Sequence, residues 1–141
     1  MPLELTLLTD GGQSATEVGA ELASFLAAAR ERLDIAVYDL RFAGAGAPVR
    51  DALLDAHARG VTVRLVYNVQ HPGPIPVPPP PRTAPEELER LPFETYGVPG
   101  VPDLMHHKYV VRDRADVWSG STNWTDDSWS RQENQIGRAH V

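Results

Sequence analysis

Cysteine is absent from the 141 residues of the chain. Disulfide bonds and thiolate metal sites are therefore excluded, while the redox compartment is left undecided. Long apolar runs are absent as well, since no uninterrupted stretch approaches the roughly 18 residues that a membrane-spanning helix needs. Residues 1–12 lack the basic segment and long apolar run of a signal peptide. We therefore expect no signal peptide, no transmembrane segment and, by default, a cytoplasmic location.

Positive charge is scarce relative to negative charge. Lysine and arginine total 13, aspartate and glutamate total 19, and the formal net charge at pH 7 is −6. Proteins that bind nucleic acid without sequence preference are usually basic, so this balance argues mildly against a duplex-binding surface and is compatible with a local basic cleft. The length predicts one compact domain that buries roughly two-thirds of the surface of the unfolded chain.

Hydrophobic residues recur in patterns that predict alternating strands and helices. Ser14 and Glu17 form a capping-box pair before an apolar stripe at helical spacing. Pro48 suits the start of a second helix that Gly60 closes. This alternation predicts an α/β fold with helices on the faces of the sheet. The strands are expected at residues 3–8, 35–40, 61–66 and 93–96.

A proline-rich segment lies in the middle of the chain. Seven prolines occur between His71 and Pro81, four of them consecutive. Such a segment cannot form a helix or a central strand, so we expect an extended loop or linker, with a ligand for a proline-reading partner as the alternative. A short helix over residues 83–91 and a turn over residues 97–102 are expected after it. The segment could border a functional cleft and influence substrate choice.

The most informative residues lie near the C-terminal end. His106, Lys108 and Asp113 follow the pattern H-x-K-x-x-x-x-D, and residues 120–123 then read G-S-x-N. A lone His-x-Lys pair is common by chance. Here, however, all residues of both motifs occur at fixed offsets within residues 106–123, which indicates a single functional site.

Strand geometry explains how these residues could meet. Residues 112–115 are polar and separate two β-favouring runs, which predicts a hairpin. Side chains alternate between the two faces of a strand, so His106 and Lys108 are expected on one face. If the turn centres on its two middle residues, Lys108 faces Ser119 and His106 faces Ser121.

These residue types suit chemistry at a phosphodiester. Lys108 supplies a positive charge to an anionic phosphate, and Asn123 and Ser121 supply neutral hydrogen bonds. A neutral His106 can attack phosphorus and form a covalent phospho-enzyme. Metal binding by His106 and His107 is disfavoured, because adjacent strand residues point apart and Lys108 repels a cation.

The motif residues resemble the phospholipase D superfamily, whose signature is this HKD pattern followed by G-S-x-N. Residues 34–40 and 49–67 resemble earlier core elements of that family. The resemblance implies a phospholipase D-like α/β/α sandwich with a mixed sheet, of which this chain is one lobe. It also implies that neither a metal nor an organic cofactor is needed. The site residues that the resemblance implies are His106, Lys108, Asn123, Asp113, Ser121 and Glu133.

The resemblance also implies a role for each residue. His106 would be the nucleophile, Lys108 and Asn123 would hold the phosphate, and Ser121 is the small residue between them. Asp113 would be structural rather than catalytic. Glu133 would accept a hydrogen bond from the second ring nitrogen of the nucleophile and stabilise its imidazolium form. The alternative for Glu133 is an ordinary surface carboxylate. Of the nearby aromatics, Trp124 and Trp129 could line the rim of the site or pack in the core.

The chemistry calls for a second histidine, because a proton must be donated to the leaving group. The chain contains one H-x-K pair. In the family that the chain resembles, the second motif comes from another half of the same chain or from a homodimer partner. We therefore expect the partner of this lobe to be either a missing C-terminal half or a second copy.

The last six residues are unusual. Residues 136–141 correspond to the translated start of a common sequencing adapter, read in frame after Gln135. This match suggests that the natural frame was lost near Gln135, and a truncated gene favours the two-lobed arrangement. We therefore expect a domain over residues 1–135 and a non-native tail over residues 136–141 that is disordered or poorly packed. A natural tail is the alternative.

Three functional hypotheses follow. The leading one is a phospholipase D-like phosphodiesterase that acts on a phospholipid through a covalent phosphohistidine at His106. The second is a single-motif endonuclease of the same superfamily that acts on DNA or RNA as a homodimer. The third is a non-catalytic half-domain, against which the intact set of His106, Lys108 and Asn123 argues.

Overall fold

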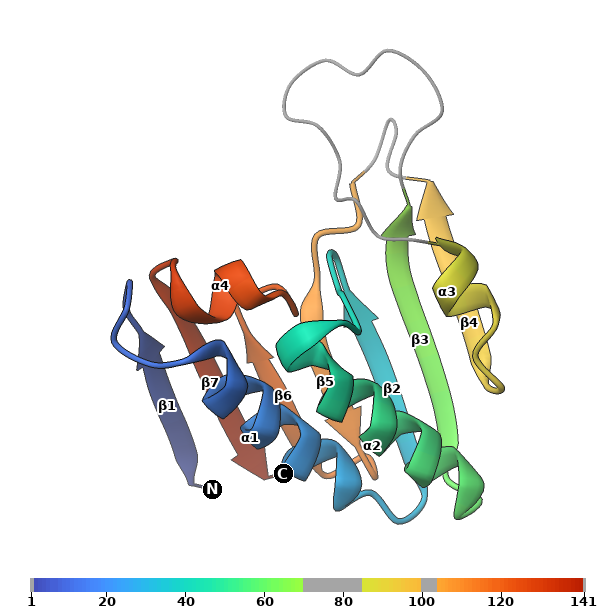
Figure 1. The fold of residues 1–141 in the computed structure, drawn as a ribbon. Coiled ribbons are helices and arrows are strands. Elements are labelled where there is room, and N and C mark those ends of the chain that lie inside the picture. The colour runs from blue at the N-terminus through green and yellow to red at the C-terminus, as the bar shows by residue number, and fades with distance from the viewer. Residues whose placement is uncertain (1, 70–84, 100–103, 141) are drawn as a thin grey trace.

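A seven-stranded mixed sheet forms the centre of the protein. The computed structural model describes residues 2–69, 85–99 and 104–140. The spatial order of the strands is β1-β7-β6-β5-β2-β3-β4 (Figure 1). In chain order the strands are β1 (Leu3–Leu8), β2 (Arg32–Val37), β3 (Thr62–Val69), β4 (Glu94–Pro99), β5 (Lys108–Arg112), β6 (Asp116–Gly120) and β7 (Asn134–His140).

The helices begin where the local sequence predicts. Ser14 caps the first helix, and its hydroxyl and the Glu17 carboxylate form the expected capping box. Pro48 lies in the first turn of the second helix, and Gly60 follows that helix with a positive φ of 90°. Such a backbone angle favours glycine, which ends the helix cleanly. The helices are α1 (Ala15–Ala27), the short 3₁₀ turn η1 (Gly44–Gly46), α2 (Ala47–Ala58), α3 (Pro85–Glu89) and α4 (Asp126–Ser130).

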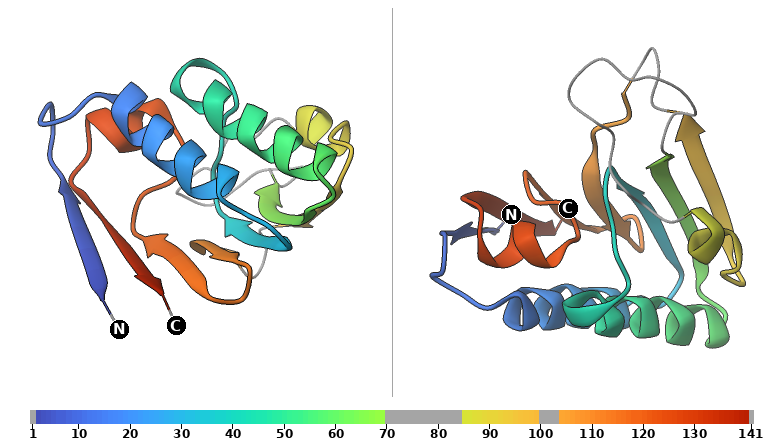
Figure 2. Two further views of the ribbon diagram at one scale, coloured as in Figure 1. Left: turned by 90° about the horizontal axis from the view of Figure 1, so that it is seen from below. Right: turned by 45° about the horizontal axis from the view of Figure 1, so that its top comes forward.

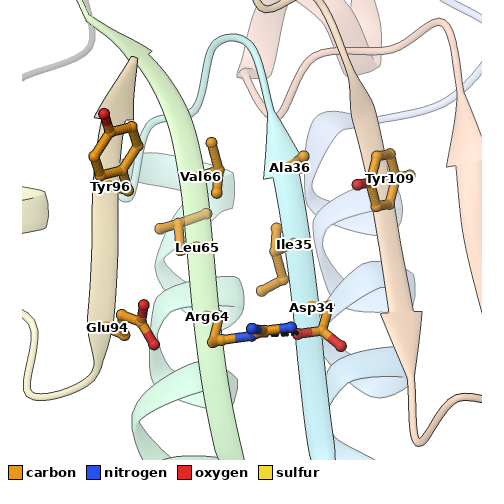
Figure 3. Close-up of a pocket in the computed structure, with 9 residues that line it drawn as sticks. All are labelled: Asp34, Ile35, Ala36, Arg64, Leu65, Val66, Glu94, Tyr96 and Tyr109. Atoms are coloured by element: carbon orange, nitrogen blue, oxygen red, sulfur yellow. Dashed lines mark hydrogen bonds and ion pairs between the residues drawn. The ribbon is translucent and has the colours of Figure 1, made fainter.

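All of the described helices cover one face of the sheet (Figures 1 and 2). The predicted α/β class and mixed sheet are confirmed, whereas the described helices form one layer and not the two layers of an α/β/α sandwich; the main core lies between this face and the helices. Trp124 and Trp129 are 2% and 1% exposed, so both pack in the core rather than on a rim. The opposite face carries a groove of about 270 Å³ in which Tyr96 and Tyr109 stand on either side of Ala36 and Val66 (Figure 3). Within residues 2–69, 85–99 and 104–140, no helix covers this groove.

Strand β2 begins earlier than its hydrophobic pattern predicts. Arg32 and Asp34 are charged, yet both belong to the strand. Asp34 forms ion pairs with Arg32 and with Arg64 on neighbouring β3, which stabilise these polar residues within the sheet. Strand β4 likewise extends to Pro99, so residues 97–99 are not part of the predicted turn. The proline-rich segment, the start of the predicted helix over residues 83–91 and the remainder of that turn lie outside the described residues.

The predicted hairpin exists, but its predicted register is wrong by one residue. Tyr109 pairs with Ser119 and Val110 pairs with Trp118, so Lys108 does not face Ser119. The last pair of the hairpin is Arg112 and Asp116, so the loop holds three residues, and in it Asp113 and Arg114 adopt positive φ angles of 53° and 59°. Strand β5 begins only at Lys108, so His106 precedes the strand instead of lying opposite Ser121.

The expectation that residues 136–141 are disordered or poorly packed is wrong for the described part of this tail. Residues 134–140 form β7, which pairs antiparallel with both β1 and β6. Ile136 is 1% exposed. An alternating run with one buried isoleucine can fill the gap between two strands, whatever its origin. Among the described residues, no helix has the length and apolar character needed to cross a membrane.

Candidate active site

The topology gathers the motif residues at one end of the sheet. Strand β2 ends beside the start of β5, because Val37 pairs with Lys108. Strand β6 ends beside the start of β7, because the two are antiparallel neighbours. Segments that leave β2 and β6 therefore meet segments that enter β5 and β7, at the upper edge in Figure 1. This edge is the candidate active site.

His106 lies on the segment that enters β5, and its side chain is accessible to solvent. Its imidazole contacts the Tyr38 ring with centroids 4.6 Å apart and an interplanar angle of 64°. Partial burial, the Lys108 ammonium and neighbouring His107 together lower the pKa of His106. A lowered pKa favours the neutral imidazole, which is the nucleophilic form.

Lys108 is the buried cation of the site, at 7% exposure. Its Nζ donates a hydrogen bond of 2.9 Å to the carbonyl oxygen of His106 and lies 5.1 Å from the centroid of the Tyr38 ring. Burial lowers the pKa of Lys108, and the Asp39 carboxylate opposes this shift. The ammonium is thus held beside the histidine by a carbonyl dipole, an aromatic face and a nearby negative charge.

Ser121 joins the segment after β6 to the start of β7. Its hydroxyl donates to Asn134 Oδ1 at 2.8 Å and accepts from the backbone N–H of Gln135 at 3.0 Å. Asn134 in turn donates through Nδ2 to the carbonyl oxygen of Ser128. Asn123 lies on the same segment as Ser121, and its buried Oδ1 has no hydrogen-bond partner within the described part of the chain.

Glu133 lies just before β7, at the same end of the sheet. It is exposed and lines a groove of about 370 Å³ together with Ser121 and Asn134. Within the described ranges, no hydrogen bond joins Glu133 to His106. Its proposed role as the partner of the nucleophile therefore stays a prediction.

Asp113 lies at the opposite end of β5 from His106, in the hairpin loop. Its carboxylate accepts from three consecutive backbone N–H groups, those of Arg30 at 2.9 Å, Glu31 at 2.8 Å and Arg32 at 2.9 Å. Burial raises the pKa of Asp113, but the three donors and the Arg112 charge together outweigh it and leave the pKa below its ordinary value. This geometry supports the structural role expected for Asp113, since it fixes the hairpin to the start of β2.

Substitution of Asp113 by alanine should destabilise the fold by about 3 kcal/mol at pH 7, because three backbone donors lose a charged acceptor and alanine disfavours positive φ. Asp113→Asn keeps one acceptor oxygen and tolerates this φ, so it should cost less. The folded pKa is lowered, so this stabilisation is complete above the unfolded pKa of about 3.9 and is lost as the pH falls through the folded pKa. Urea unfolding at pH 7 and near pH 3 measures both effects. Equal stability of wild type and Asp113→Ala at pH 7 would contradict the structural role.

Two residues of the site were missed by sequence reasoning. Tyr38 and Asp39 follow β2 directly; the Tyr38 ring contacts both His106 and Lys108, and the Asp39 charge acts on Lys108. Their sequence signal was only a polar pair at the end of an apolar strand. Among the described residues, no group of three or more histidine, cysteine, aspartate and glutamate side chains is placed to hold a metal ion.

Comparisons with known proteins bear on the family and the fold of the chain. Residues 22–137 match the family model described as "Cardiolipin synthase, PLD-like domain". NucT from Helicobacter pylori has a similar structure, with a TM-score of 0.71, 17% sequence identity, and coverage of 99% of this chain and 86% of NucT. The phospholipase D family member Nuc from Salmonella typhimurium gives the same TM-score and identity, with coverage of 99% and 84%.

A larger protein shares part of the fold. Phosphatidylserine synthase from Haemophilus influenzae Rd KW20 matches with a TM-score of 0.62 and 10% identity. That match covers 98% of this chain and 35% of the synthase. No curated protein matches the chain significantly in sequence.

Proposed function

The chain belongs to the phospholipase D-like family, and from this premise we propose that it cleaves phosphodiester bonds through a covalent phosphohistidine at His106. The observation that carries the proposal is the 2.9 Å hydrogen bond from Lys108 Nζ to the carbonyl oxygen of His106. This bond holds a buried cation beside the histidine. An ammonium and an adjacent neutral imidazole are the two groups that attack on an anionic phosphate requires.

The proposed reaction has two steps. A ring nitrogen of His106 forms a bond to phosphorus while the bond from phosphorus to the leaving oxygen breaks, and the leaving oxygen takes a proton from a second histidine. Water then attacks phosphorus while the second histidine, now neutral, takes a proton from it, and the bond from phosphorus to His106 breaks to release the phosphate product and the free imidazole. Lys108, Asn123 and Ser121 would hold the phosphoryl oxygens in both steps.

The second histidine must come from outside this lobe, if it is a motif histidine like His106. A second copy of the chain or a further half with its own motif would supply it. The whole-chain likeness to NucT and Nuc, which are of similar size, supports a second copy. The likeness to about a third of the synthase supports a further half. Specific activity that rises with protein concentration would favour a second copy.

Phospholipid is the first candidate substrate. The matching family is described as cardiolipin synthase, and β1 exposes three leucines on one side of the strand. Leu3 is 69% exposed, Leu5 60% and Leu7 67%. An exposed apolar strip of this kind suits contact with a lipid surface.

Nucleic acid is the second candidate substrate. The observation in its favour is the groove lined by Ser121, Glu133 and Asn134, which is open at the motif end of the sheet. The chain also matches NucT and Nuc over nearly its whole length. A single strand could reach such a groove without the broad basic surface that duplex binding needs.

Three substrates separate these possibilities. Bis(4-nitrophenyl) phosphate reports the chemistry alone, and we expect it to be hydrolysed in the presence of excess EDTA, because the proposed mechanism uses no metal. Vesicles of phosphatidylglycerol and cardiolipin test the lipid candidate, and a fluorescent single-stranded oligonucleotide tests the nucleic acid candidate. Loss of all hydrolysis in EDTA, with recovery on adding a divalent metal, would contradict the metal-free mechanism. Cleavage of the vesicle lipid without the oligonucleotide, or of the oligonucleotide without the lipid, assigns the substrate class.

A further inference from the structure

Tyr38 contacts both the imidazole and the ammonium of the site. Its ring centroid lies 4.6 Å from that of His106 and 5.1 Å from Lys108 Nζ. We propose that Tyr38 is a positioning residue whose ring holds the His106 imidazole and the Lys108 ammonium in one arrangement. The inference rests on the proposed phosphodiester cleavage.

The backbone around Tyr38 is tied to both motif segments. The N–H of Tyr38 donates to the carbonyl oxygen of His107 at 2.8 Å. The N–H of Trp124 donates to the carbonyl oxygen of Asp39 at 2.9 Å, and the N–H of Arg41 donates to the carbonyl oxygen of Trp124 at 3.0 Å. The segment that leaves β2 is therefore hydrogen-bonded both to the segment that enters β5 and to the segment that leaves β6. These bonds fix the backbone from which the Tyr38 ring projects.

The His106 side chain depends on its neighbours for orientation. It lies outside a strand and is accessible to solvent. No hydrogen bond within the described ranges reaches its ring nitrogens, so the edge-on contact with Tyr38 is the described interaction that restrains the ring. Aromatic rings prefer such tilted contacts, and an aromatic face attracts an ammonium within about 6 Å. One ring can thus restrain both groups.

The ring, rather than the hydroxyl, is the part of Tyr38 that this inference concerns. Tyr38→Leu removes the aromatic face while keeping an apolar side chain, and Tyr38→Phe keeps the face while removing the hydroxyl. Tyr96→Leu is the matched control, because Tyr96 is an exposed tyrosine on β4 and lies outside the candidate active site. Turnover of bis(4-nitrophenyl) phosphate reports the reaction. The ring C–H resonances of His106, identified by their loss in His106→Asn, report the contact directly.

We expect Tyr38→Leu to lower kcat roughly tenfold with little change in KM, since misplacing the reacting groups weakens the transition state more than the bound substrate. Tyr38→Phe should rescue kcat, and Tyr96→Leu should leave it unchanged. The His106 resonances should move in Tyr38→Leu and stay near their wild-type positions in the other two variants.

The two readouts separate this inference from the proposed function. If the wild type hydrolyses no phosphodiester, the proposed function fails, while the resonances still test whether Tyr38 orients His106. Wild-type kcat together with unmoved His106 resonances in Tyr38→Leu would overturn the inference, as would a loss of kcat in Tyr38→Phe equal to that in Tyr38→Leu. Circular dichroism checks folding, and Tyr38→Met replaces Tyr38→Leu, with the same expected results, if the leucine variant does not fold.

Discussion

Asparagine in place of His106 should abolish turnover, with kcat lower by about three orders of magnitude or more, because the covalent intermediate can no longer form. The substitution should leave the fold intact, since the side chain of His106 is exposed and lies outside the strands. Hydrolysis of bis(4-nitrophenyl) phosphate measures the loss. Acid-labile phosphate on the quenched wild-type enzyme, absent from the variant, measures the intermediate itself.

His107→Asn is the matched control for this experiment. The two histidines are adjacent, and the His107 ring contacts Tyr109 at 5.8 Å rather than Tyr38. We expect near wild-type turnover in His107→Asn. Full activity of His106→Asn would contradict the covalent mechanism. Equal losses in both variants would show that turnover depends on the structure of this segment rather than on the His106 imidazole itself.

The pH dependence of turnover should reflect the environment of His106. Burial, Lys108 and His107 lower its pKa. The attacking histidine must be neutral, and the neutral form predominates above the pKa, so a lowered pKa extends activity toward acid. We therefore expect the acid limb of kcat/KM to lie below the ordinary histidine value of about 6.5. A second histidine that must be protonated would add an alkaline limb, so apparent values belong to the pair.

Local sequence patterns predicted much of this arrangement. The capping box at Ser14, the end of α2 at Gly60 and the hairpin itself depend on neighbouring residues, and each is present. The predicted hairpin register is wrong because the last pair is Arg112 and Asp116, which leaves a three-residue loop in which Asp113 and Arg114 both adopt positive φ. Neither residue is glycine, so the loop sequence did not predict a three-residue turn. The carboxylate of Asp113 compensates by binding a distant part of the chain.

Contacts across the sheet were beyond the reach of local patterns. Tyr38 and Asp39 meet the motif only because β2 lies beside β5, and strand order is a property of the whole sheet. Likewise, the proximity of Ser121 to Asn134 depends on β6 and β7 being neighbours. The motif therefore predicted the chemistry and its main residues, whereas the side chains that surround them could be found only from the fold.

Loss of the Lys108 ammonium should be nearly as damaging as loss of His106. Lys108→Met keeps the long apolar stem in its buried position and removes the charge, so we expect a fall in kcat/KM of roughly a hundredfold to a thousandfold, similar to the removal of a strong transition-state donor. Lys108→Arg is the matched variant that keeps the charge. It should retain more activity than Lys108→Met but less than wild type, because a planar guanidinium fits a buried point-charge site poorly.

Lys108→Met should also move the acid limb of the pH profile. The Lys108 charge is one of the causes that lower the pKa of His106, so its removal should raise that pKa toward the ordinary value. The acid limb of the residual activity should then shift to higher pH, whereas Lys108→Arg should leave it near the wild-type position. A hundredfold loss without this shift would mean that Lys108 binds phosphate without acting on His106. A shift without the loss would mean that Lys108 tunes His106 and does not hold the phosphate, because a phosphate ligand cannot be removed without weakening the transition state.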